Sequence, residues 1–138
     1  MVTYLSSHLP MKKSGDIWLG APLPEDYPAA HAYLSLLFPD ATAGKLAKRL
    51  RTAPTVRREA KDILRASQTH LLDESDPHVE ADLKRIRKGK KLSPVLLVRG
   101  DARRGVTLTI ADGHHRICAS WYWDENGPVA CRIVSMAG

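Results

Sequence analysis

The stretch Leu108-Thr-Ile-Ala-Asp-Gly-His-His-Arg-Ile-Cys-Ala-Ser120 carries the strongest structural signal in the chain. Its apolar start predicts a strand, Asp112-Gly113 predicts a sharp turn, and a helix is expected to begin near His115. A glycine at a strand-to-helix turn can adopt a positive φ and lets a ligand approach the backbone. The first turn of the helix offers unpaired N–H groups and the positive end of its dipole, which together attract anions.

Two imidazoles and a guanidinium follow this turn, at His114, His115 and Arg116. Arginine is permanently charged and can bind two phosphate oxygens at once. One interpretation is therefore a phosphate-binding corner. The other is a turn that begins a helix, with the charged and polar side chains simply in solvent. The residues alone favour neither interpretation.

The composition is that of an ordinary soluble domain. The chain has 138 residues, of which 43% are hydrophobic and 26% charged, and this suits one domain with a modest core. No apolar run approaches the roughly 20 residues of a membrane span, and the first residues lack the order of a signal peptide. We therefore expect a cytoplasmic protein without membrane contact. Cys118 and Cys131 lack metal-ligand spacing and suit small buried hydrophobes.

The positive charge is clustered in two segments. The formal net charge is +6, and residues 45–66 and 84–104 together hold 17 of the 21 basic residues, eight in the first and nine in the second. Only three acidic residues accompany them. Such clustering favours a polyanionic partner, either nucleic acid or a phosphorylated ligand, although ordinary solvated helix faces explain it equally well.

Three regions are expected along the chain. Residues 1–23 carry scattered prolines and glycines without a period, which indicates an irregular or partly disordered lead-in. Residues 24–54 predict a helical hairpin that opens at Asp26-Tyr-Pro28 and ends at Pro54. The second helix would be capped by Asp40 or Thr42. The apolar stripe of the first helix is expected to consist of Tyr33, Leu34, Leu37 and Phe38.

Residues 55–138 are expected to form the core domain. Residues 55–67 fit either a helix or a short strand followed by a helical turn. Asp76-Pro77 predicts the start of a helix that stops near Gly89. The remaining elements are a hairpin of Pro94–Gly100 and Val106–Ala111, a short helix after the Asp-Gly-His-His turn, and a last strand over Pro128–Val134.

These features resemble a known family. Leu92-Ser-Pro-Val-Leu-Leu-Val98, the hairpin and Ile110-Ala-Asp-Gly-His-His-Arg-Ile-Cys-Ala119 with the last strand resemble the ParB N-terminal and sulfiredoxin-like fold. The run from Asp112 to Arg116 matches the Asp-Gly-His-His-Arg motif of the free serine kinases of that fold. The resemblance implies an α+β domain with a small mixed sheet and packed helices, preceded here by the helical hairpin.

The resemblance also implies a nucleotide with Mg²⁺ as ligand, namely CTP in ParB, ATP in sulfiredoxins and ADP in the serine kinases. Gly113, His114, His115 and Arg116 would contact phosphate, and Asp112 would brace the turn or help hold Mg²⁺. Nucleotide hydrolysis or phosphotransfer would be the reaction. In that case His115 would donate a hydrogen bond.

The catalytic carboxylate that the serine-kinase resemblance implies would be Asp73 or Glu74, ahead of the predicted helix that starts at Asp76-Pro77. Because His114 stands at the position of the sulfiredoxin nucleophile, sulfinic-acid repair is not expected.

Three other interpretations remain. The helix at 45–51 and the hairpin at 99–104 could grip a nucleic-acid backbone without reading its sequence. Asp112, His114 and His115 could hold a metal for phosphodiester cleavage, although residues so close in sequence need a distant further ligand. In the third interpretation the helical hairpin docks a partner or a second copy of the chain, which would give a homodimer.

Overall fold

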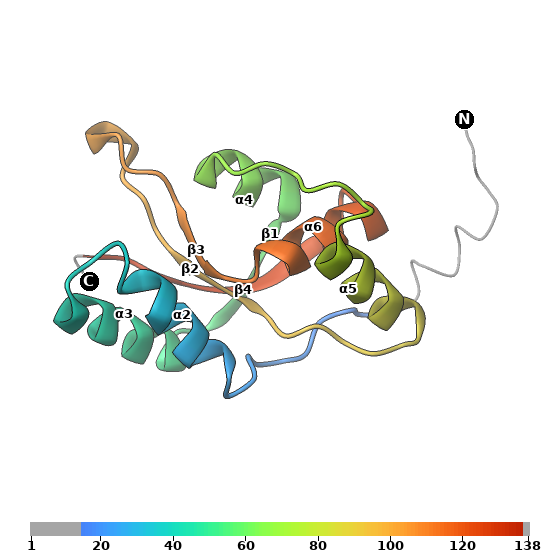
Figure 1. Ribbon diagram of the computed structural model, residues 1–138, viewed down its shortest axis with the longest axis horizontal. Coiled ribbons are helices and arrows are strands. Elements are labelled where there is room, and N and C mark those ends of the chain that lie inside the picture. Colours follow the sequence, from blue (N-terminus) through green and yellow to red (C-terminus); the bar gives the residue numbers. More distant parts are fainter. Residues whose placement is uncertain (1–14, 137–138) are drawn as a thin grey trace.

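The computed structural model describes residues 15–136 and shows an α+β fold, with five helices and a four-stranded mixed sheet in that range (Figure 1). In chain order the elements are α2 (Asp26–Leu34), α3 (Asp40–Thr52), β1 (Thr55–Glu59), α4 (Ala60–Ser67), α5 (Pro77–Arg87), β2 (Val95–Val98), the 3₁₀ turn η2 (Ala102–Arg104), β3 (Thr109–Asp112), α6 (His114–Trp123) and β4 (Pro128–Val134). None of these helices combines the length and apolarity that a membrane crossing requires.

The sheet has the strand order β1-β4-β2-β3. β4 lies between β1, to which it is antiparallel, and β2, to which it is parallel. β2 and β3 form the expected antiparallel hairpin, with an irregular register between Leu96 and Leu97. β3 is therefore an edge strand, and α6 begins directly at its end.

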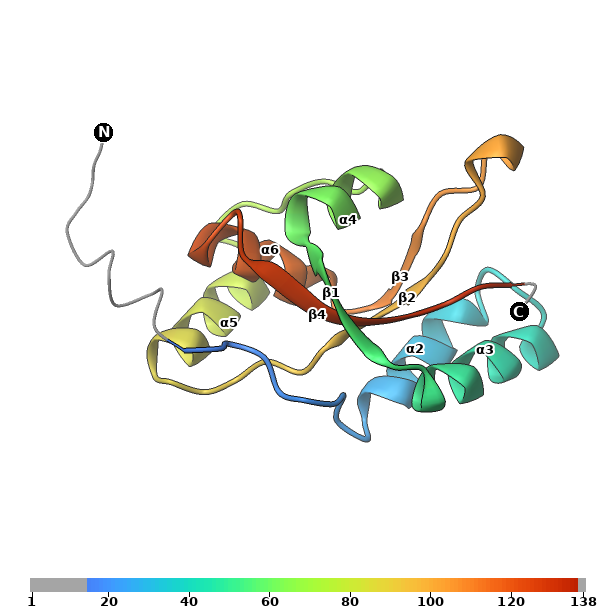
Figure 2. The ribbon, with the colours of Figure 1, turned by 180° about the vertical axis from the view of Figure 1, so that it is seen from behind.

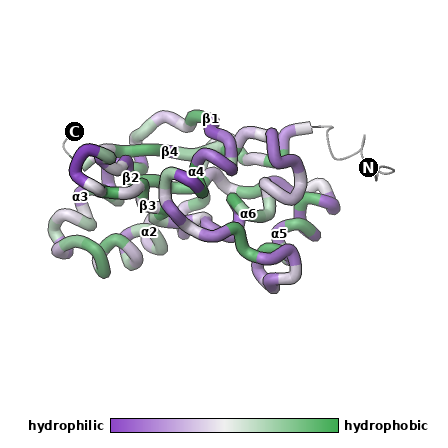
Figure 3. Tube along the Cα trace, turned by 90° about the horizontal axis from the view of Figure 1, so that it is seen from above, coloured by the Kyte–Doolittle hydropathy of each residue, from purple (hydrophilic) through white to green (hydrophobic). Residues whose placement is uncertain are grey.

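Helices cover both faces of the sheet (Figure 2). Because successive strand residues point to opposite faces, the fully buried strand β2 serves two cores. Val95 and Leu97 pack in the core beneath α4, α5 and α6, whereas Leu96 and Val98 pack against α2 and α3. This double burial explains the unbroken apolar run of the strand. Figure 3 shows the hydrophobic colours along β2 and β4.

The helical hairpin is present, with corrections. α2 ends at Leu34, and the expected apolar stripe is confirmed only in part: Leu34 is buried and Phe38 packs against the same core, but Tyr33 and Leu37 are 45% and 51% exposed. The chain turns there because Leu36 and Leu37 donate 3₁₀-type bonds back to Tyr33 and Leu34. Neither predicted cap is used, because α3 begins at Asp40 after Pro39 without a side-chain cap.

The ambiguous segment 55–67 is a strand followed by a helix, β1 and α4. The second strand of the hairpin is shorter than predicted, because Val106 makes only an isolated bridge to Asp101 and β3 starts at Thr109. The N-terminal prediction falls partly on residues 1–14, which lie outside the described residues.

The described end of the lead-in, residues 15–23, has neither helix nor named strand. It nevertheless contributes to the core, since Trp18 is 2% exposed and its indole N–H donates to the carbonyl of Pro128 at 3.0 Å.

Candidate functional site

The turn between β3 and α6 depends on Gly113. This residue has a φ of +114° and occupies the N-cap position of α6, which therefore has no side-chain cap. A Cβ atom at this position would collide with the side chain of Val95. The sequence places glycine here because both the backbone conformation and the close approach to β2 exclude a side chain.

Arg116 is directed into the protein and braces the turn. Its guanidinium donates to Asp112 Oδ2 at 2.7 Å, to the Ser93 carbonyl at 2.8 Å and to the Ser93 hydroxyl. Asp26 Oδ2 from α2 lies 3.7 Å from the same guanidinium. The side chain of Arg116 is only 13% exposed. Arg116 thus joins α6, the edge of the sheet and the helical hairpin, and both of its terminal nitrogens already donate to acceptors within the protein.

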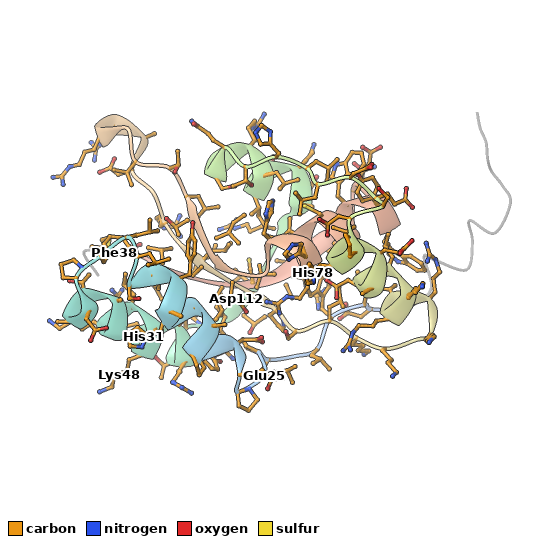
Figure 4. The ribbon with its side chains drawn as sticks, viewed as in Figure 1. Glu25, His31, Phe38, Lys48, His78 and Asp112 are labelled. Carbon is orange, nitrogen blue, oxygen red and sulfur yellow. The ribbon has the colours of Figure 1, made fainter. Side chains whose placement is uncertain are left out.

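Asp112 and Asp26 flank this guanidinium and have little contact with solvent. Burial raises the pKa of the Asp112 carboxyl above its usual range, and the Asp26 carboxylate adds to the rise while Arg116 opposes it. Asp26 also accepts a bond from the Leu23 N–H at 2.8 Å. Both carboxylates therefore take part in fixing the turn. Figure 4 shows Asp112 beside the start of α6.

The two histidines of the motif have different neighbours. His114 Nε2 lies 2.9 Å from the carbonyl oxygen of His70, to which an N–H at that position donates. His115 faces His78 of α5, with ring centroids 4.6 Å apart. Burial lowers the pKa of His115, and the nearby His78 lowers it further, although Asp76 partly opposes the shift. His115 is thus held in its neutral form near neutral pH.

A cleft of about 550 Å³ opens beside this turn and is called the α6 cleft below. One wall comes from α2 and the residues after it, another from the end of α4, and the floor from β3 and the segment before it. The lining residues are Ala29, Tyr33, Leu37, Ser67, Thr69, Thr107, Leu108, Thr109, Ile110, Ala111, Asp112, Gly113, His114 and His115. The cleft combines an apolar wall, several hydroxyl groups and the start of a helix.

The start of α6 supplies hydrogen-bond donors at one end of this cleft. The first bond of the helix runs from the Ile117 N–H to the Gly113 carbonyl, at 3.0 Å. The N–H groups of residues 114–116 therefore have no acceptor in the preceding turn of the helix. No side-chain oxygen caps them. The positive end of the helix dipole adds to the attraction for an anion.

The predicted catalytic carboxylates do not join this site. Asp73 and Glu74 lie on the connection between α4 and α5, beside Tyr122, about two helical turns along α6 from His114. Asp73 accepts bonds from the Glu74 N–H and the Ser75 hydroxyl, and neither carboxylate lines the cleft.

The residues predicted to hold a metal do not converge. Across residues 15–136, no group of three or more His, Cys, Asp or Glu side chains is placed to bind a metal ion. Asp112 faces Arg116, while His114 and His115 have ring centroids 6.2 Å apart and different neighbours. The side chains present therefore do not fit a metal centre at this turn.

The basic segments are partly engaged within the protein. Arg49 donates to the Ser135 carbonyl at 2.6 Å, and Arg51 lies over the ring of Tyr27. Lys48 points away from the sheet (Figure 4). The exposed basic groups therefore belong to the outer face of α3 and to other surfaces, among them the β2–β3 hairpin tip.

Sequence reasoning missed Asp26, His78 and the cleft wall of Tyr33 and Leu37. The only local signal for His78 was its position after Asp76-Pro77.

Comparisons of the chain with protein-family models, with curated proteins and with solved structures found no match.

Proposed function

We propose that the protein binds a nucleotide in the α6 cleft, with a phosphate at the start of α6. The observation that carries the proposal is that this uncapped helix start opens on the cleft. Phosphates bind at such helix starts through backbone N–H groups and the helix dipole. The cleft volume of about 550 Å³ lies within the usual range for small-molecule sites.

The lining of the cleft suits the two parts of a nucleotide. Tyr33 and Leu37 form an apolar surface against which a base can pack, and the hydroxyls of Thr69 and Thr109 can bond to polar edges of the ligand. His115 can donate one hydrogen bond to a phosphate oxygen. Arg116 acts by holding the turn in place, since its guanidinium is bonded to Asp112 and Ser93.

The proposal covers binding. Asp112 is the only carboxylate among the described lining residues, and Arg116 engages it. Hydrolysis or phosphotransfer with Asp73 or Glu74 as base would require those residues to leave their position beside Tyr122.

We also propose the ParB/sulfiredoxin-like fold as the finer description of the domain. The hairpin, the glycine turn into α6 and the return strand β4 support it.

Calorimetric titration with ATP, ADP and CTP, each with and without Mg²⁺, tests the proposal. Two adjacent leucines give a matched pair of variants, because Leu37 lines the cleft and the 81% exposed Leu36 does not. Leu37→Glu should weaken nucleotide binding at least about tenfold, because it removes part of the apolar surface for the base and adds a negative charge to a cleft that takes an anion, whereas Leu36→Glu should have a much smaller effect. Absence of binding by all three nucleotides, or equal effects of the two variants, contradicts the proposal.

The second candidate is binding of nucleic acid without sequence preference. Its specific support is the hairpin tip, where the side chains of Arg103 and Arg104 are 96% and 82% exposed around Asp101. Affinity for duplex DNA should then fall steeply with added salt, because phosphate contacts release counterions. A flat salt response, or unchanged binding in an Arg103→Ala, Arg104→Ala variant, contradicts this candidate.

A further inference from the structure

His78 and His115 form an imidazole pair between two helix starts. Each is the second residue of its helix, His78 in α5 and His115 in α6. Their ring centroids are 4.6 Å apart, with 42° between the ring planes. His115 also lines the α6 cleft, whereas His78 does not. A phosphate at the start of α6 therefore meets His115, and it influences His78 through that ring. Figure 4 shows His78 at the end of α5 nearest α6.

The surroundings of the pair admit one proton more readily than two. Two imidazolium ions at this separation repel each other, and both rings lie in a first helical turn, where the dipole disfavours positive charge. The charged and titratable groups that face His115 are His78, Asp76 and Asp82 from α5, and His114 from its own helix. Asp76 already accepts bonds from the N–H groups of His78 and Val79.

We propose that a phosphate dianion bound at the start of α6 draws one proton from solvent onto the His78–His115 pair. His78 is then a positioning residue that acts through His115. The site binds dianions more tightly as the pH falls toward 6, and it favours the terminal phosphate of a nucleotide over the monoanionic phosphodiesters of nucleic acid. This inference rests on the proposed function, because it requires the phosphate to lie in the α6 cleft.

The charge balance of the site supports this coupling. Without ligand, burial and the neighbouring His78 lower the pKa of His115, which favours its neutral form. A dianion adds two negative charges beside the ring and favours the imidazolium form, which can then donate to the phosphate from its cleft side. A phosphodiester adds only one negative charge and stabilises the proton less.

The first experiment uses the ligand-free protein and follows the imidazole C–H signals by NMR as a function of pH. In His78→Gln, which removes the second imidazole but keeps a polar side chain, the pKa of His115 should rise. His70→Gln is the matched control, because only the backbone carbonyl of His70 contacts the site. An unchanged pKa of His115 in His78→Gln overturns the pair.

The second experiment measures binding of sulfate, which remains a dianion throughout the range in which histidine titrates. Calorimetry at pH 7 in buffers of different ionisation enthalpy should show uptake of close to one proton by the wild type and clearly less by His78→Gln, with His70→Gln like the wild type. Binding without proton uptake overturns this inference alone. If neither sulfate nor ADP binds, the proposed function fails, and the coupling fails with it.

Discussion

The helices α5 and α6 begin next to each other, yet their first turns are satisfied in opposite ways. At α5, the Asp76 side chain accepts from the N–H groups of His78 at 2.9 Å and Val79 at 3.2 Å, and Pro77 has no N–H to satisfy. At α6, Gly113 has no side chain that could accept.

The comparison shows what an omitted cap makes possible. The carboxylate of Asp76 occupies the position that an anionic ligand would take, and the hydrogen bond from the Val79 backbone lowers its pKa. The start of α6 keeps its donors for a ligand. Its stability must then come from elsewhere, and the contacts of Arg116 with Asp112 and Ser93 supply it. Substitutions at the start of α5 should therefore act through the lost cap, and those at the start of α6 through the lost bracing of the turn.

The largest effect is expected from Arg116→Ala. It leaves Asp112 and the 8% exposed Asp26 without their counter-charge, and breaking a buried ion pair costs about 3–5 kcal/mol of unfolding free energy. Urea denaturation followed by circular dichroism measures the loss. Arg103→Ala, at an exposed hairpin position, should change stability by less than about 0.5 kcal/mol. A loss below about 1 kcal/mol for Arg116→Ala contradicts the bracing role.

Gly113→Ala should follow, with a loss of about 2–4 kcal/mol from the strained backbone and the collision with Val95. Gly105→Ala is the matched control, because Gly105 also has a positive φ, of +73°, but has open space around it. The control should lose only about 1–2 kcal/mol, in the same denaturation experiment. Equal losses would show that the close approach to β2 has no energetic weight.

Asp76→Ala should lower the melting temperature by a smaller amount, because it removes the side-chain cap of α5. The exposed Asp73, which is three residues earlier and caps no helix, provides the comparison. Thermal unfolding of both variants at pH 7 distinguishes them. If Asp76→Ala is as stable as Asp73→Ala, α5 does not depend on its side-chain cap, and the contrast with α6 loses its basis.

The smallest effect concerns pH. Because the pKa of His115 is lowered in the folded protein, the unfolded chain binds the proton more readily, so stability falls as the pH drops below about 6.5. The melting temperature of the wild type should therefore decline from pH 7.5 to 5.5 by more than that of His115→Gln. Asp112, whose pKa is raised, acts in the opposite sense, but it is common to both proteins. Parallel pH profiles would contradict the prediction.

Much of the fold could be predicted because its signals are local. The Asp76-Pro77 helix start, the β2–β3 hairpin and the turn at Gly113 each depend on residues adjacent in sequence. The secondary structure of residues 55–67 could not be decided from the sequence, because a strand and a helix follow each other there without a break. The strand has five residues and the helix eight, so neither is long enough to show a clear period.

The site was less predictable than the fold. Placing Gly113, His114 and His115 at a helix start required only the motif. The direction of Arg116 could not be predicted, because it depends on Asp26, which α2 brings from the far end of the chain. The same holds for Trp18, which reaches the core only because it pairs with Leu92. Contacts between distant segments leave no periodic pattern in the sequence.

The position of β4 has a consequence for biosynthesis. This strand is the last of the four to be made, yet it lies between β1 and β2 and supplies the partner for both. On the ribosome, β1 therefore waits without a neighbour until Val134 has been translated and has left the exit tunnel. Until then only the β2–β3 hairpin and the helices can form, so the nascent chain completes its sheet in one late step, and β1 exposes unpaired backbone groups up to that moment.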